Sequence, residues 1–275
     1  MSKDLNDDAS IIANHAISAV DPVLSIKRSV KRKNDTLTIA DRIYNLKNYN
    51  NIYIVAFGKA SVPMAKAMEQ ILGDKITEGI TLTKYGYGNT QQLKNIPVFE
   101  AGHPVPDENS VIGAKKIKQM LEKTEENDLV LFLISGGGSS LLTLPRNNIK
   151  LADLIESTRL LLRAGATIKE INTIRKHISD VKGGGLARLT YPAESMSLIL
   201  SDVVGDPLDV IASGPTVPDT STFKDFENIV NRYKLELPAS IKYLLADGLT
   251  GRVKDTPKPL YPIFNRCHHH LIGNN

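Results

Sequence analysis

The segment best suited to chemistry spans residues 128–142 and reads DLVLFLISGGGSSLL. Its apolar run, LVLFLI, shows no polar alternation, which predicts a strand buried on both faces of a parallel sheet covered by helices. Glycines directly after such a strand let several backbone N–H groups converge on an anion. Because open α/β sheets bind ligands at the carboxyl ends of their strands, we predict a phosphate or carboxylate site here. Its candidate residues are Ser135, Gly136, Gly137, Gly138, Ser139 and Ser140.

Two other predicted strands are followed by charged residues. Lys59 follows the strand at 52–57 in the segment FGKAS, and Asp202 and Asp206 follow the strand at 196–201 in SDVVGDPLD. A cation, a nest of N–H donors and two carboxylates on one sheet edge form the combination that phosphoryl transfer requires. The lysine loop is not a Walker A motif, since G-x-x-x-x-G-K-S/T is absent. The alternative is a surface lysine and two turn-forming or helix-capping aspartates.

Three further polar residues are candidates for binding an anion. His103 lies between a glycine and a proline, and is either a site residue or a hydrogen-bonded turn histidine. Arg175 and Lys182 either contact an anion or belong, with Lys176, to a solvated helix face, the usual environment of such side chains. The sequence leaves both alternatives open.

The histidine triplet 268–270 suggests a metal site, but strand geometry argues against one. Alternation along a strand puts His268 and His270 on one face and His269 on the other, so at most two could share an ion. Structural zinc takes four ligands, so we do not expect zinc here.

Hydrophobic periodicity places strands and helices in alternation along the chain. Strands are expected at 52–57, 79–84, 129–134, 196–201 and 267–273, with a short one within 97–110. Helices are expected at 8–20, from 61 onward, at 111–121 and over 152–181, the last ending at the glycines 183–185. This alternation indicates βαβ units. The expected fold class is therefore α/β, a parallel sheet with helices on both faces in three αβα layers.

Composition limits the classes of protein that fit. The 275 residues can form one large domain, or one domain and part of another, and the net charge of +4 is scattered, with only a short basic run at 27–33. No apolar run approaches the ~20 residues of a membrane span, and the acidic N-terminus lacks the apolar core of a signal peptide. A single cysteine, Cys267, fits a reducing cytoplasm. We expect a cytoplasmic protein without nucleic-acid or membrane partners, and leave a homodimer open.

The last twenty residues suggest a change of domain. Residues 254–257 have the composition of a linker, and the strand at 267–273 ends in glycine with no returning helix after it. We therefore expect one domain at 1–255, followed at 256–275 by a linker and the first strand of a truncated second domain.

Five segments together carry a resemblance to a known family. VAFGKAS, AGHPVPDE, LFLISGGGSSLL, EINTIRKHISDVKGG and LILSDVVGDPLDVIASGPTVPD occur in the family's order across about residues 50–220. The chain thereby resembles the class II glycerate 2-kinases, which carry a C-terminal MOFRL domain. The resemblance implies a Rossmann-like N-terminal domain, with the MOFRL domain missing here. It also implies phosphorylation of D-glycerate at its 2-hydroxyl by ATP with Mg²⁺, in a cleft between the two domains.

The resemblance also implies roles for the candidate residues. Lys59 would neutralise charge on the transferring phosphoryl group or on the glycerate carboxylate, and the loop 135–140 would hold an anionic group. Asp202 and Asp206 would hold Mg²⁺, or one of them would act as the base. Two alternatives remain, namely an anion- or sugar-phosphate-binding module without chemistry and a hydroxypyruvate reductase. The reductase is disfavoured because no G-x-G-x-x-G fingerprint follows a strand.

Overall fold

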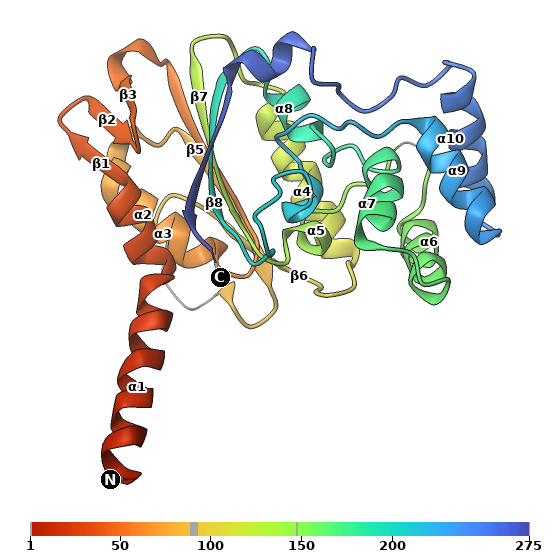
Figure 1. Cartoon of the computed structure of the whole chain (residues 1–275). Helices are drawn as coiled ribbons and strands as arrows, with labels where there is room; N and C mark the ends of the chain where they lie inside the picture. The colour runs from red at the N-terminus through yellow and green to blue at the C-terminus, as the bar shows by residue number, and fades with distance from the viewer. Residues whose placement is uncertain (1, 89–92, 147, 275) are drawn as a thin grey trace.

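A six-stranded parallel sheet forms the centre of the computed structural model, which describes residues 2–88, 93–146 and 148–274 (Figure 1). Its strands are β4 (Asn51–Phe57), β5 (Glu78–Lys84), β6 (Val98–Ala101), β7 (Asp128–Ser135), β8 (Glu194–Leu200) and β9 (Cys267–Gly273). They lie in the order β6-β5-β4-β7-β8-β9, and every neighbouring pair is parallel. The chain therefore reverses its direction of winding between β4 and β7, and such a switch point is where doubly wound sheets bind ligands.

Helices cover both faces of this sheet because its central strands are apolar on both sides. All eight residues of β7 are buried. One face packs against α2 (Pro22–Ser29), α3 (Ser61–Leu72) and a small antiparallel sheet of β1 (Val30–Lys33), β2 (Thr36–Ile39) and β3 (Arg42–Asn45). The other packs against α4 (Glu108–Leu121), α5 (Gly138–Leu141) and α8 (Gly185–Thr190) (Figure 1). The prediction of an α/β fold with three layers is confirmed.

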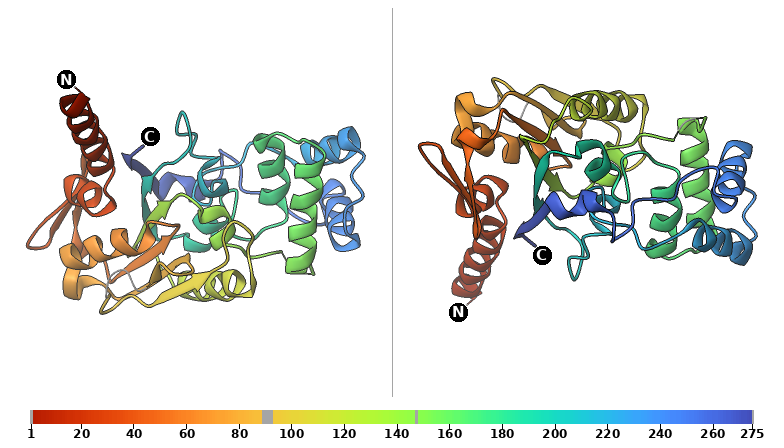
Figure 2. Two further views of the ribbon diagram at one scale, coloured as in Figure 1. Left: turned by 90° about the horizontal axis from the view of Figure 1, so that it is seen from below. Right: turned by 90° about the horizontal axis from the view of Figure 1, so that it is seen from above.

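A further group of helices lies outside α5 and α8, away from the sheet (Figures 1 and 2). It consists of α6 (Leu151–Arg163), α7 (Ile168–His177), α9 (Phe223–Tyr233) and α10 (Ala239–Leu249), which share an apolar core of their own. The single helix expected over 152–181 is wrong. Gly165 adopts φ 74°, a left-handed conformation that ends α6. Thr167 then caps α7 in a capping box with Glu170.

The helix α1 (Ser2–Ala19) projects away from the rest of the molecule (Figure 2). It ends where Asp21 begins α2, since the Asp21 carboxylate accepts a hydrogen bond of 2.8 Å from the Leu24 N–H. Among the described residues, short 3₁₀ turns are formed by η1 (Leu46–Asn48), η2 (Gly73–Lys75), η4 (Ile211–Ser213) and η5 (Pro262–Arg266). None of the described helices has the length and apolar character needed to cross a bilayer.

The C-terminal strand β9 belongs to the same sheet, pairing with β8 from Cys267 to Gly273. Its histidines point to opposite sides. His268 Nε2 lies 3.3 Å from a Glu194 carboxylate oxygen, whereas His269 Nε2 lies 3.1 Å from the Thr216 carbonyl. Across the described residues no three metal-binding side chains gather into one cluster. The division of the chain at residue 255 stays a prediction.

Candidate active site

The loops that follow β4 and β7, the two strands at the switch point, are joined to each other. The Lys59 N–H donates to the Gly136 carbonyl at 2.8 Å, and the Ala60 N–H donates to Ser135 Oγ at 3.0 Å. Gly58 permits this contact, because a Cβ at that position would lie 2.2 Å from Ser135 Oγ. The buried Ser135 hydroxyl thus joins the lysine loop to the glycine loop. These are two of the three loops that were expected at this edge of the sheet.

The glycines bring charged side chains directly against the backbone. A Cβ on Gly136 would lie 2.0 Å from an Asp202 carboxylate oxygen. On Gly137, which adopts φ 84°, a Cβ would lie 2.9 Å from His103 Nε2 and 3.2 Å from Lys59 Cε. Groups from three separate loops therefore surround the same turn, and only residues without a side chain leave room for them.

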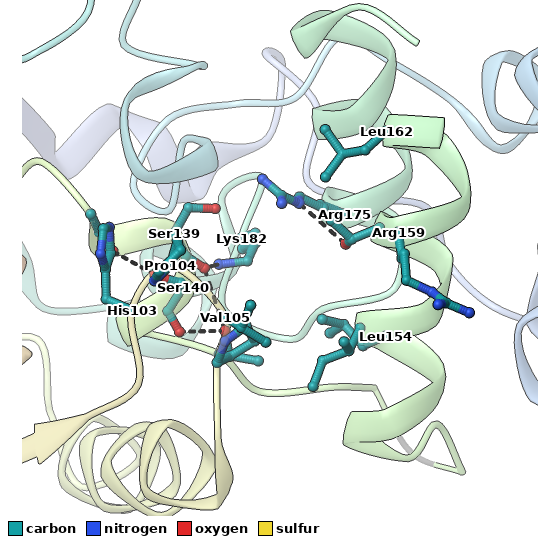
Figure 3. A pocket seen from close by; sticks show the side chains of 15 residues that line it. His103, Pro104, Val105, Ser139, Ser140, Leu154, Arg159, Leu162, Arg175 and Lys182 are labelled. Carbon is teal, nitrogen blue, oxygen red and sulfur yellow. Dashed lines mark hydrogen bonds between the residues drawn. The ribbon is translucent and has the colours of Figure 1, made fainter. Parts of the chain in front are cut away.

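A cavity of about 470 Å³ opens beside this turn. Its walls come from the loop 103–106, the glycine loop, α6 and α7. Figure 3 shows Ser139 and Lys182 on one side and Leu154 and Leu162 on the other, with Arg175 reaching between them from α7. One end of the cavity is therefore polar and cationic, and the opposite wall is apolar.

Lys182 is buried at the polar end of this cavity. Its Nζ donates to the carbonyls of Ser139 and Leu142, the latter at 2.9 Å. Burial, together with the nearby positive charge of Arg175, lowers the pKa of Lys182 to about 7. Two carbonyls occupy two N–H groups, so the ammonium form keeps one N–H for a ligand.

Arg175 is the second cation of the cavity. Its Nε donates to Thr158 Oγ1 at 3.5 Å, and burial lowers the pKa of its guanidinium. Within the part of the chain that the structure describes, neither Arg175 nor Lys182 forms an ion pair. Two cations without carboxylate partners make this end of the cavity suited to an anion.

The alternative of a solvated helix face is wrong for Lys182 and for Lys176, since both are buried. Lys176 pairs instead with Asp219 at 3.4 Å and Asp209 at 3.5 Å. The difference arises because the loop that ends at Asp219 folds over α7 and supplies carboxylates, which the local pattern of the helix does not reveal.

Three polar side chains form a directed chain of hydrogen bonds at Ser139. Ser213 Oγ donates to Asn172 Oδ1 at 3.1 Å, and Ser139 Oγ lies 2.7 Å from Ser213 Oγ. Because Asn172 Oδ1 can only accept a hydrogen bond, the Ser213 hydroxyl donates its single proton to Asn172. In the bond between the two serines, Ser139 must therefore be the donor and Ser213 the acceptor. The Ser139 oxygen therefore offers lone pairs, and no proton, to the cavity.

His103 lies where the cavity meets the lysine loop. Burial lowers the pKa of its imidazole, and the charges of Lys59 and Lys84 lower it further, while Asp202 acts in the opposite direction. The imidazole is consequently neutral near pH 7. Lys84, the last residue of β5, was missed by sequence reasoning although its place at a strand end was visible. Asn172 and Ser213 carried no such signal, because only the fold brings them to Ser139.

The two aspartates of the third loop lie differently. Asp202 is exposed and touches Gly136, whereas an Asp206 carboxylate oxygen accepts a 2.7 Å hydrogen bond from the Asn274 amide. The other Asp206 oxygen is buried, and the Ser201 hydroxyl and the Asn274 amide lower the pKa of this carboxyl. Mg²⁺ is commonly held by one or two carboxylates together with substrate phosphates. Asp202 fits the role of a Mg²⁺ ligand, because its exposed carboxylate lies beside the glycine loop. Asp206 could offer only one carboxylate oxygen to the ion, because the other one is bonded to Asn274.

The glycine triplet 183–185 does not form a second nest of donors. The N–H groups of Gly183 and Gly184 donate to the carbonyls of Ser213 and Gly214 at 3.0 and 2.8 Å. The triplet instead leads into a helix, since α8 begins at Gly185.

Fold and site together define a doubly wound α/β protein with a crevice at its switch point that is lined at one end by cations. The chain belongs to the family described as "Domain of unknown function (DUF4147)", whose model matches residues 8–246. Its curated relatives include glycerate kinases and also a putative hydroxypyruvate reductase of Agrobacterium vitis, which is 45% identical over 74% of this chain and 45% of that protein. The chain is 43% identical to the glycerate 2-kinase of Pyrococcus horikoshii, over 100% of this chain and 61% of that protein. It is 41% identical to the D-glycerate 2-kinase of Thermotoga maritima, over 90% of this chain and 57% of that protein.

Two solved structures superimpose closely on the chain. A Pyrococcus horikoshii protein superimposes with a TM-score of 0.90 at 44% identity, covering 98% of this chain and 60% of that one. The Thermotoga maritima glycerate kinase superimposes with a TM-score of 0.84 at 40% identity, covering 99% and 59%. The chain therefore spans about three fifths of the length of these relatives.

Proposed function

We propose that this chain is the N-terminal part of a class II glycerate 2-kinase, whose remaining part is a MOFRL domain. The reaction is transfer of the γ-phosphoryl group of ATP to the 2-hydroxyl of D-glycerate, giving ADP and 2-phosphoglycerate. One observation carries the proposal: Lys59, His103 and Asp202 lie against the same two glycines, Gly136 and Gly137. Phosphoryl transfer depends chiefly on positioning and on neutralising charge, and this arrangement supplies both.

The glycine loop and Lys59 would hold the transferring phosphoryl group. The N–H groups of Gly138 and Ser139 have no acceptor among the described residues. They directly follow Gly137, against which the Lys59 side chain lies. Such converging N–H groups bind phosphate oxygens. Asp202 would hold Mg²⁺, and the ion when bound supplies positive charge to the phosphate oxygens.

The cavity would hold glycerate. Its carboxylate fits the cationic end formed by Arg175 and Lys182, and a hydroxyl of the substrate can donate to the Ser139 oxygen. The substrate would then approach Lys59 at Gly137, where His103 also lines the cavity. A neutral imidazole at this point can accept the proton of the attacking hydroxyl.

The test is release of ADP from ATP, Mg²⁺ and D-glycerate, followed with a coupled assay on this chain. Release that depends on glycerate supports the kinase. The second candidate is an anion-binding module without chemistry, which the cations Arg175 and Lys182 of the cavity also fit. That candidate predicts binding of glycerate or ATP, measured by calorimetry, without release of ADP. A reductase would instead oxidise NADH in the presence of hydroxypyruvate.

A further inference from the structure

A second polar cavity, of about 340 Å³, lies between α8 and α10 and the loops beside them. Three cationic side chains line it, those of Arg146, Arg188 and Lys254. None of them belongs to the cavity of the candidate active site. The kinase proposal uses none of them either.

Arg146 is the unusual member, because it is only 8% exposed. Across the described chain its side chain has one acceptor, the Lys254 carbonyl, at 3.3 Å, and it forms no ion pair. The guanidinium carbon of Arg146 lies over the Phe223 ring, 5.9 Å from the ring centroid. A guanidinium has five N–H donors, and burying its charge without a counter-ion is costly. The Asp180 and Asp255 carboxylates act on Arg146 only from beyond ion-pair distance, so among the described residues this buried cation has no directly paired anion.

The carboxylates of this cavity do not fill that role. Asp247 is already bound by Arg252, with both its Nε and Nη2 at 2.7 Å. An Asp180 carboxylate oxygen lies 3.8 Å from Arg188 Nη2 and forms an ion pair with that residue. Asp180 thus pairs with one of the three cations and Asp247 pairs with Arg252, which is outside the lining, so Arg146 and Lys254 leave the cavity with a positive surplus.

We propose that Arg146, Arg188 and Lys254 form a second anion-binding site, for a phosphate group. Arginine presents a planar fork of donors that matches phosphate oxygens in pairs, and lysine adds a point charge. The phosphate is either free or part of a small phosphate ester, both of which a volume of about 340 Å³ accommodates.

Two segments, 143–146 and 178–182, are hydrogen-bonded to each other, and each contributes residues to both cavities. The Arg146 N–H donates to the Ile178 carbonyl at 3.1 Å, and the Asp180 N–H donates to the Leu144 carbonyl at 2.9 Å. Arg146 and Asp180 line the second cavity, while Thr143 and Lys182, three and two residues away, line the first. Occupation of the second site is therefore expected to alter the amide signals of both segments.

The test is titration of the isotope-labelled full chain with inorganic phosphate, and separately with glycerol 2-phosphate, at constant ionic strength. We expect saturable shifts of the backbone amides of Asn148, Asp180 and Arg188. A tighter constant for the ester than for inorganic phosphate assigns the site to an esterified ligand, and equal constants assign it to the phosphate group alone. The same amides must respond in Lys59→Met, which weakens phosphate binding at the candidate active site only.

Variants separate this site from general attraction by positive charge. Arg188→Gln combined with Lys254→Gln should weaken phosphate binding at these amides at least tenfold. The control pair, Arg163→Gln with Lys234→Gln, removes the same charge from neighbouring helices and should leave the constant unchanged. Arg146→Met tests the buried cation, since an apolar residue of similar length can replace a buried charge without loss of folding. The proposal is overturned if these amides stay unmoved at 50 mM phosphate, or if both double variants weaken binding equally.

Discussion

The Asp202 carboxylate occupies the space that a side chain on Gly136 would fill. A Cβ at residue 136 would lie 2.0 Å from Asp202 Oδ2 and 2.5 Å from its Cγ. The carbonyl of the same glycine accepts the Lys59 N–H at 2.8 Å. One residue thus sets the separation between the acidic loop and the basic loop of the site.

Gly136→Ala should displace Asp202 without unfolding the protein. The φ of Gly136 is outside the left-handed region, and the group in the way is the end of an exposed side chain, so the backbone can tolerate alanine. We expect turnover to fall at least tenfold, with a thermal midpoint within a few degrees of the unchanged chain. The measurement is ADP release with a matched melting curve. If Asp202→Ala is silent while Gly136→Ala is not, the carboxylate has no part in the effect.

Lys59→Met should abolish turnover and leave the fold intact. The Lys59 side chain is exposed, and its backbone bond to Gly136 does not depend on the charge. Removing one group that stabilises transition-state charge costs on the order of 10²-fold or more in rate. Lys33→Met, on the exposed edge of β1, is the matched control. Near-normal turnover of Lys59→Met would contradict the assignment of this lysine.

Much of this arrangement could be predicted from the sequence. The apolar run of β7 and the glycines after it fixed a strand, a turn and a place at the carboxyl edge of the sheet, because each depends on neighbouring residues only. The same holds for Lys59, which directly follows β4. Parallel pairing of β4 with β7 then brings the two loops together, although two other strands separate them along the chain, so this pairing had to be seen in the structure.

The rest depended on contacts between distant segments. Nothing local distinguishes Asp202, which touches Gly136, from Asp206, which bonds to Asn274. The burial of Lys182 and the link from Ser139 to Asn172 arise because the helices of the outer group fold back over the glycine loop. The break between α6 and α7 was readable in principle, since Thr167 and Glu170 have the spacing of a capping box.

Lys182 should make the stability of the folded chain depend on pH in a predictable direction. Its pKa is about 7 in the folded chain, against 10.5 ordinarily. Between these values the unfolded chain binds the proton and the folded chain does not, so stability rises with pH. Below pH 7 the full cost of burying the charge is present. The contribution approaches ~1.4 kcal/mol per pH unit within this window.

The measurement is urea unfolding of the unchanged chain and of Lys182→Met at pH 7, 8 and 9. Other groups titrate in both proteins, so the difference between the two free energies of unfolding isolates Lys182. We expect that difference to shift by about 2 kcal/mol in favour of the unchanged chain from pH 7 to pH 9. A difference that stays constant would mean that the lysine keeps its ordinary pKa in the folded state.

The chain of hydrogen bonds from Ser139 through Ser213 to Asn172 predicts that substrate recognition depends on a residue outside the cavity. Asn172→Asp keeps an acceptor for Ser213, so the Ser139 oxygen still offers lone pairs to the substrate hydroxyl. Asn172→Leu removes the acceptor and leaves Ser213 free to donate to Ser139, which can then turn its own proton toward the cavity.

We expect the KM for D-glycerate to rise about tenfold in Asn172→Leu, equivalent to one lost hydrogen bond of ~1.4 kcal/mol, and to stay within twofold in Asn172→Asp. Ser139→Ala should match Asn172→Leu in KM for glycerate, and neither should change the KM for ATP. Equal KM values for glycerate in Asn172→Asp and Asn172→Leu would mean that the direction of the chain has no bearing on binding.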